Sequence, residues 1–196
     1  MTELNANYWN NRYCDNNIPW DIGYVAPALK NKFDTIIDKK THILIPGAGS
    51  AHEAIYLHQA GFENVWVCDW AESAFKHLKE KCPDFPAKHL LVEDFFKLDL
   101  TVDLIVEQTF FCAISPDLRA EYARKAAQLL NREGQLFGLL FSTEFSRQGP
   151  PFGGNKEQYL EIFTPHFKII LLEESKESIQ PRLGNELFIH LKKKHL

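Results

Sequence analysis

Short apolar runs alternate with amphipathic segments along most of the chain. Residues 41–46 form an apolar run that ends in Pro-Gly, which predicts a buried strand followed by a turn. Further strands are predicted over residues 64–68, 88–92, 102–106, 135–141, 168–174 and 186–192. Helices are predicted over residues 51–60, 72–81, 117–130 and 156–163. This alternation predicts an α/β fold with a parallel sheet, right-handed crossovers and a hairpin formed by the last two strands.

Capping signals set the expected ends of the helices. Ser50 and Glu53 have the spacing of a capping box, and Gly61 is expected to stop the helix that they begin. Gly134 is expected to close the helix over residues 117–130. Residues 142–155 hold several glycines and prolines and are expected to form a loop.

Length and charge narrow the class of protein. A chain of 196 residues with 45% hydrophobic residues suits a single domain, residues 1–196, and shows no repeat or linker. The net charge of −4 lacks the excess of positive charge that nucleic-acid binding requires. The chain has no apolar stretch of about 18 residues and no leader pattern at Met1, Thr2 and Glu3. We therefore expect a soluble monomer that binds neither nucleic acid nor membrane.

The cysteines favour a reducing compartment. The chain has four of them, widely spaced and without a CxxC pair: Cys14, Cys68, Cys82 and Cys112. This spacing suggests neither a zinc site nor a disulfide framework. We expect a cytoplasmic protein with free thiols and without a bound metal.

The residues after the first two strands suggest a nucleoside ligand. Gly47 and Gly49 follow the first strand and let the main chain approach a ligand closely. The third glycine of a dinucleotide fingerprint is replaced by His52, which disfavours a pyrophosphate cofactor. Asp69 ends the second strand and is placed to accept hydrogen bonds from ribose hydroxyls, although a solvated strand end is an alternative. S-adenosylmethionine (SAM) is a common ligand with this chemistry.

Two further strand ends are acidic. Asp94 follows the third strand and could accept the amino hydrogen of adenine while Phe95 packs on the ring. Glu107 ends the fourth strand and precedes Phe110 and Phe111. Either acid could instead be a helix cap or a surface group, and the phenylalanines could belong to the core or to a pocket.

Aromatic residues crowd the otherwise polar start of the chain. Trp9, Tyr13 and Trp20 could form a lid over a sulfonium, because aromatic faces attract a cation that has no hydrogen-bond donors. The alternative is an N-terminal arm that packs on the sheet. We treat residues 1–40 as a lid segment.

An ordered set of motifs resembles the thiopurine methyltransferase superfamily, and most closely its plant-type halide, thiocyanate and thiol methyltransferases. The set consists of Trp9-x3-Tyr13-x6-Trp20-Asp21-x-Gly23, Pro46-Gly47-Ala48-Gly49, Phe110-Phe111-Cys112-Ala113-Ile114-x-Pro116 and Gly149-Pro150-Pro151-Phe152. The resemblance runs from about Trp9 to Lys192, which is nearly the whole chain.

The resemblance implies a class I SAM-dependent methyltransferase, with a Rossmann-like seven-stranded sheet whose last strand is antiparallel. The residues that it implies for SAM binding, together with the glycine loop, are Trp9, Tyr13, Trp20, Gly47, Gly49, Asp69, Asp94, Phe95 and Glu107. It also places Arg182 on the acceptor side, where the side chain could attract an anion, and we add Phe111 as a second candidate substrate contact. No residue is assigned as catalytic.

Two positions depart from the plant-type pattern, and the acceptor therefore stays open. Those relatives usually carry tryptophan in place of Tyr13 and aspartate in place of Glu107. The expected reaction is methyl transfer from SAM to a small soft nucleophile: a thiol, thiocyanate, hydrosulfide or halide. The alternatives are methylation of a thiopurine-like aromatic thiol or of an oxygen or nitrogen nucleophile, a SAM-binding protein without turnover, and a dehydrogenase, which His52 opposes.

Overall fold

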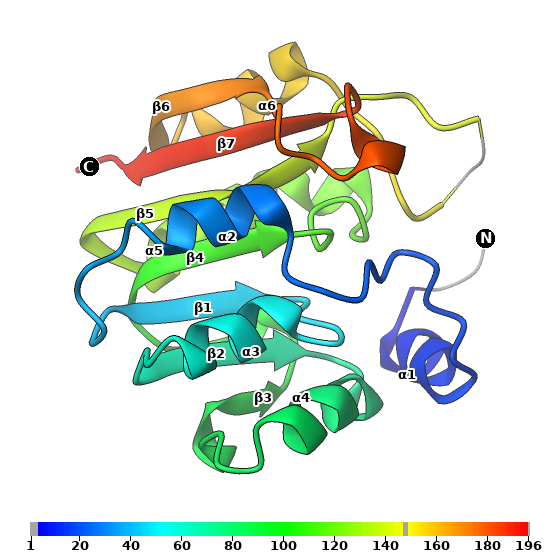
Figure 1. Ribbon diagram of the computed structural model, residues 1–196. Helices are drawn as coiled ribbons and strands as arrows, with labels where there is room; N and C mark the ends of the chain where they lie inside the picture. Colours follow the sequence, from blue (N-terminus) through cyan, green and yellow to red (C-terminus); the bar gives the residue numbers. More distant parts are fainter. Residues whose placement is uncertain (1–3, 147–148, 196) are drawn as a thin grey trace. The chain divides into compact units, whose positions relative to one another are not determined.

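Three short parallel strands form the sheet of the first part of the chain. The computed structural model describes residues 4–146 and 149–195, so that Met1, Thr2 and Glu3 lie outside the described residues. The chain divides into two compact units, Met1–Leu98 and Asp99–Leu196. In the first unit, β1 (His42–Pro46) pairs in parallel with β2 (Asn64–Asp69), and β2 pairs in parallel with β3 (Leu90–Val92) (Figure 1).

Helices in the first unit connect these strands and also precede them. They are α1 (Ala6–Cys14), α2 (Pro27–Phe33), α3 (His52–Gln59) and α4 (Lys76–Lys81), with 3-10 turns η1 (Glu72–Phe75), η2 (Ala87–His89) and η3 (Phe95–Lys97). The predicted stop at Gly61 is confirmed. Gly61 has a φ of 84° and donates its N–H to the His58 carbonyl, while Phe62 donates to Leu57. This paired pattern is a Schellman motif.

The predicted capping box at the start of α3 is wrong. The N-cap residue is Ala51, which has a φ of 58° and no capping side-chain hydrogen bond in the described structure. Ser50 and Glu53 make longer-range hydrogen bonds instead, to Asp21 and to the Ala26 amide. A local capping rule fails here because tertiary partners compete for the same polar atoms.

The strands of the second unit pair first in parallel and then antiparallel. Its strands are β4 (Val102–Gln108), β5 (Leu130–Phe141), β6 (Phe167–Glu174) and β7 (Glu186–Lys193). β4 and β5 pair in parallel, whereas β7 pairs antiparallel with both β5 and β6. The helical elements are η4 (Pro116–Leu118), α5 (Arg119–Leu129), α6 (Lys156–Phe163) and η5 (Gln180–Arg182). The predicted closing hairpin is therefore confirmed as β6 and β7.

Gly134 does not end a helix, and that prediction is wrong. α5 ends at Leu129, and Gly134 lies within β5. The register against β4 jumps here, from Val102 opposite Leu130 to Leu104 opposite Gln135. A Cβ on Gly134 would lie 2.7 Å from the Leu130 Cβ, so this irregular part of the strand requires glycine.

The strand order identifies the fold class. The described strands follow the order β3-β2-β1-β4-β5-β7-β6 in one seven-stranded sheet, with the last strand antiparallel to its neighbours. This is the predicted Rossmann-like sheet. Within the described residues, no helix has both the length and the apolar character needed to cross a membrane. The interpretation of residues 1–196 as one methyltransferase domain stays a prediction.

Candidate functional site

The loop after β1 has an unusual backbone conformation and lies at the carboxyl ends of β1 and β2. Gly47, Gly49 and Ala51 all have positive φ, at 56°, 53° and 58°. The Ala48 amide donates to the Cys68 carbonyl over 3.1 Å, which ties the loop to the carboxyl end of β2. Ala51 is strained in this conformation, and such strain often accompanies a ligand site. The predicted glycine loop is therefore present.

Asp69, the last residue of β2, stabilises this loop by hydrogen bonds. One carboxylate oxygen accepts the Gly49 N–H at 3.0 Å, and the other accepts the Ala71 N–H at 2.9 Å. Burial raises the pKa of Asp69, although these amide hydrogen bonds favour the carboxylate. Each oxygen keeps a second acceptor position, which a ribose hydroxyl could use.

The predicted aromatic residues lie together on the aromatic arm, the name we give to residues 5–24. Trp9 and Tyr13 come from α1, whose first turn is capped by the Asn5 side chain. The Trp20 ring contacts both in edge-to-face geometry, at centroid distances of 5.4 Å to Trp9 and 5.9 Å to Tyr13. The sequence grouped these three residues correctly, whereas their contact with SAM stays a prediction.

A cation of the protein itself lies over one of these rings. The Arg12 guanidinium is 4.9 Å from the Trp20 centroid, and its Nε donates to the Asn17 carbonyl at 2.7 Å. Sequence reasoning missed Arg12, because one arginine in a polar segment gives no signal. The Trp20 ring thus holds the arm together through contacts with Trp9, Tyr13 and Arg12.

Tyr13 joins the aromatic arm to the glycine loop. A Cβ placed on the buried Gly49 would lie only 2.6 Å from the Tyr13 hydroxyl oxygen. Burial, together with the nearby Asp69 carboxylate, raises the pKa of Tyr13 above its usual range. The side chain is therefore a neutral phenol, whose face stays aromatic and uncharged beside the loop.

A second contact fixes α1 to η1. The Ser73 hydroxyl donates to the Asn10 side-chain oxygen at 2.7 Å, and the Ser73 amide donates to the same oxygen at 3.2 Å. Both residues are polar and 63 positions apart, so no local pattern predicted the pair. This contact fixes the helix that carries Trp9 and Tyr13.

Asp21 forms a third contact, between the arm and the start of α3. Its carboxylate accepts a hydrogen bond from the Ser50 hydroxyl and lies 2.7 Å from Nε2 of His52. It also accepts the Gly23 amide at 2.7 Å, within the arm itself. The motif that includes Asp21 and Gly23 was the only signal in the sequence, and it did not indicate these partners.

Asp94 and Phe95 lie after β3, as predicted. The Asp94 carboxylate accepts the Phe96 amide at 3.0 Å and caps η3. Phe95 is 3% exposed, so its ring belongs to the core of the first unit. Asp94 thus has the capping role that the sequence left open, and the adenine contacts of both residues stay predictions.

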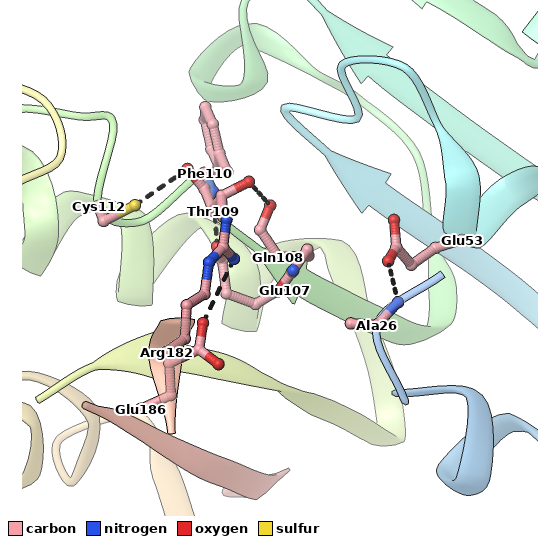
Figure 2. A network of polar contacts seen from close by, with 9 residues as sticks. All are labelled: Ala26, Glu53, Glu107, Gln108, Thr109, Phe110, Cys112, Arg182 and Glu186. Atoms are coloured by element: carbon pink, nitrogen blue, oxygen red, sulfur yellow. Dashed lines mark hydrogen bonds and ion pairs between the residues drawn. The ribbon is translucent and has the colours of Figure 1, made fainter. Parts of the chain in front are cut away.

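Glu107 is buried inside the second unit at the end of β4 (Figure 2). One carboxylate oxygen accepts the Phe110 and Phe111 amides at 2.9 and 2.8 Å, and the other accepts the Tyr122 hydroxyl at 2.7 Å. A Cβ on Gly138 of the neighbouring β5 would collide with the Glu107 carbonyl. Burial raises the pKa of Glu107 to about 7. The side chain organises the loop after β4, and its predicted contact with SAM stays untested.

The two candidate substrate contacts also lie in the second unit. Phe111 is 1% exposed and packs against Tyr122 and Phe163, with the Arg119 guanidinium 4.8 Å from its centroid. Arg182 pairs with the buried Glu186 at 3.4 Å, as Figure 2 shows. The structure places Phe111 in the core and Arg182 at the end of η5, ahead of β7, and their roles toward substrate stay predictions.

Replacing Gly49 with alanine should weaken SAM binding by about tenfold, or about 1.4 kcal/mol. The new Cβ would meet the Tyr13 hydroxyl at 2.6 Å, and the φ of 53° adds backbone strain. Titration calorimetry with SAM measures the change. Gly61→Ala is the matched control, because Gly61 has a φ of 84° but nothing within 4 Å of its added Cβ. Equal SAM affinities for Gly49→Ala and the wild type would contradict the expectation.

Comparisons with known proteins identify the family of the chain. The family model of thiopurine S-methyltransferase (TPMT) matches residues 4–190. Thiocyanate methyltransferase 1 of Brassica oleracea is 31% identical, with 91% of this chain and 81% of the relative covered. The Arabidopsis thaliana protein named "Probable thiol methyltransferase 2" is 28% identical, with coverages of 95% and 84%.

A solved structure shares the fold at low sequence identity. It is the Burkholderia thailandensis 1,6-didemethyltoxoflavin-N1-methyltransferase with bound S-adenosylhomocysteine. It superposes with a TM-score of 0.78 at 15% identity and covers 97% of this chain and 87% of its own. The family match, the relatives and the fold together show that the chain belongs to the thiopurine S-methyltransferase family of SAM-dependent methyltransferases.

Proposed function

We propose that the protein transfers a methyl group from SAM to a small soft nucleophile: a thiol, thiocyanate, hydrosulfide or a halide. The names of the thiocyanate and thiol methyltransferase relatives support this acceptor class. The observation that carries the SAM site is the position of Tyr13, which lies against Gly49 and beside Asp69. The first unit thus brings together the aromatic ring of Tyr13, the main chain of Gly49 and the carboxylate of Asp69.

The residues present fit SAM. The positive φ of Gly47 and Gly49 exposes main chain where side chains would collide, and Asp69 would accept hydrogen bonds from the ribose hydroxyls. Trp9 and Tyr13 would present uncharged aromatic faces toward the sulfonium. When bound, SAM supplies an electrophilic methyl group on a positively charged sulfur. We add Asp94 and Phe95 as the adenine side of the same site.

The reaction needs little proton chemistry from the protein. The proposed acceptors are anionic or ionise easily near neutral pH, so that a strong general base is not required. The contribution of the protein is to hold the nucleophile in line with the methyl carbon and to exclude water. On the acceptor side we propose Phe111 and Arg182, the second as a cation that attracts the anion. Glu107 would act by fixing the loop that contains Phe111.

The family name favours a second acceptor class, an aromatic thiol of the thiopurine type. Such an acceptor has the same soft sulfur but needs a wider pocket. We propose the small anions first, because both relatives described above carry names of thiol or thiocyanate enzymes. We further propose a cytoplasmic monomer, in keeping with the four cysteines, which are all free thiols.

A turnover assay tests the proposal directly. The protein is incubated with methyl-labelled SAM and, separately, with iodide, thiocyanate, hydrosulfide or an aromatic thiol, and volatile and extractable label are counted. We expect product with the small anions. Product from the aromatic thiol alone would assign the wider acceptor class, and SAM binding without any product would contradict the proposed reaction. Calorimetry with SAM on the same sample keeps binding and turnover apart.

A further inference from the structure

Residues 50–53, around the start of α3, hold the chain that follows α1 at two points, one of them in the aromatic arm. Asp21 contacts Ser50 and His52, the latter at 2.7 Å. Five residues later, the Ala26 amide donates to the buried Glu53 carboxylate at 3.1 Å (Figure 2). The partners Ser50, His52 and Glu53 are neighbours along the chain, and they directly follow the glycine loop. The position of the arm is therefore coupled to the segment that is proposed to cradle SAM.

We propose that Asp21 is a positioning residue for SAM binding. Together with Ser50 and His52 it forms the Asp21 clasp, which holds Tyr13 and the rest of the aromatic arm against the glycine loop and tightens when His52 is protonated. The inference rests on the proposed SAM site at Gly49 and Asp69. It also gives a function to His52, the residue that replaces the third glycine of the dinucleotide fingerprint.

The geometry of the Asp21 clasp favours a charged pair. Only 16% of the Asp21 side chain and 14% of the His52 side chain are exposed, so water screens the pair weakly. Burial alone would raise the pKa of Asp21, but hydrogen bonds from His52, Ser50 and the Gly23 amide hold it below its usual range. Asp21 is therefore a carboxylate throughout the neutral range, and it presents a fixed negative charge to His52.

Several titratable groups face His52, and their effects differ in sign. The hydrogen bond to Asp21 raises the pKa of His52, burial opposes this shift, and Glu53 on the same helix adds to it. The His77 ring of α4 lies 5.1 Å from the His52 ring, and burial with the charge of His52 lowers the pKa of His77. His77 also faces Lys81 and Glu80. His52 therefore takes up its proton at a higher pH than His77.

The direction of the pH effect follows from linkage. With the clasp closed, the pKa of His52 lies above its ordinary value of 6.5. Closure is therefore most favourable below pH 6.5 or so, and its advantage is lost as the pH rises through the raised pKa. A neutral His52 can still donate one hydrogen bond, so we expect a gradual decline in SAM affinity and not a complete loss.

Three variants separate the parts of the Asp21 clasp. Asp21→Asn removes the charge, Ser50→Ala removes one hydrogen bond, and His52→Gln keeps a donor that does not titrate. His58→Gln is the matched control, because His58 lies on the same helix and its Nε2 is 3.2 Å from the exposed Asp84. Each variant is compared with the wild type by calorimetric titration of SAM from pH 6 to pH 9, and by amide hydrogen exchange of residues 5–20 without SAM.

We expect Asp21→Asn to bind SAM at least tenfold more weakly and to exchange its arm amides faster. Ser50→Ala should show the same changes to a smaller degree. His52→Gln should bind SAM with an affinity that no longer depends on pH in this range, whereas His58→Gln should keep the dependence of the wild type.

Two results would overturn the clasp. One is wild-type SAM affinity and wild-type arm exchange in both Asp21→Asn and Ser50→Ala, which together guard against a folding defect in either variant. The other is an unchanged pH dependence in His52→Gln. Failure of the wild type itself to bind SAM would instead overturn the proposed SAM site, so that the two failures are distinguishable.

Discussion

Replacing Asp69 with alanine is expected to weaken SAM binding by about 100-fold, or about 2.8 kcal/mol. Two losses combine in this variant. The ribose hydroxyls would lose a charged acceptor, at about 1.5 to 3 kcal/mol for each such hydrogen bond. The Gly49 and Ala71 amides would also lose the carboxylate that now accepts them at 3.0 and 2.9 Å. The site would thus lose both a contact with the ribose and the hydrogen bonds that stabilise the glycine loop.

Calorimetric titration of SAM measures this loss, and a second variant divides it. Asp69→Asn keeps one oxygen acceptor, so we expect an affinity between those of the wild type and Asp69→Ala. Asp84→Ala is the control, because Asp84 is an exposed aspartate of the same unit that contacts His58. Normal SAM affinity in Asp69→Ala would refute the ribose assignment.

The parts of the fold that depend on local pattern were predictable. The strand over residues 64–68 and the stop at Gly61 follow from hydrophobic periodicity and from the conformational freedom of glycine, and both are present. Gly47, Gly49 and Asp69 could be grouped because they follow neighbouring parallel strands, whose carboxyl ends share one edge of the sheet.

The parts that depend on long-range polar partners were not predictable. Ser50 has the spacing of a capping residue, yet it donates to Asp21, which is 29 positions away along the chain. Gly134 has the position of a helix stop, yet it lies in an irregular part of β5, where a larger residue would collide with Leu130. α1 was not predicted because it buries none of its residues fully, so it lacks the periodic apolar face that marks a helix.

Replacing Glu107 with alanine should destabilise the second unit by about 4 kcal/mol, the largest effect on folding that we expect. The substitution leaves three donors without their acceptor inside the protein: the Phe110 amide, the Phe111 amide and the Tyr122 hydroxyl. Each buried donor without a partner costs about 1 to 3 kcal/mol. Urea denaturation, followed by circular dichroism at constant pH, measures the free energy of unfolding.

The pH dependence of stability provides an independent check on Glu107. Its pKa is about 7 in the folded protein and has an ordinary value of 4.5, so the folded state binds this proton more tightly. The contribution to stability is therefore complete below pH 4.5 and is lost as the pH rises through about 7. The shift corresponds to roughly 3 kcal/mol at about 1.4 kcal/mol per pKa unit.

Glu107→Gln isolates this effect, because an amide keeps an oxygen acceptor but does not titrate. The free energy of unfolding of the wild type, minus that of Glu107→Gln, should decrease by about 3 kcal/mol between pH 4.5 and pH 8. Glu121→Gln is the control, since Glu121 is exposed and pairs with Arg124 on α5. A constant difference across this range would show that Glu107 does not carry a proton in the folded state.

The burial of three cysteines has a consequence for an enzyme that handles an alkylating cofactor. Cys68, Cys82 and Cys112 are buried, and burial raises the pKa of each thiol, for Cys112 to about 12. Because the thiolate is the reactive form, these sulfurs are poor targets for methylation near neutral pH. Burial thus protects these three thiols from methylation by the cofactor that the protein binds. A brief treatment with iodoacetamide should label the exposed Cys14 first.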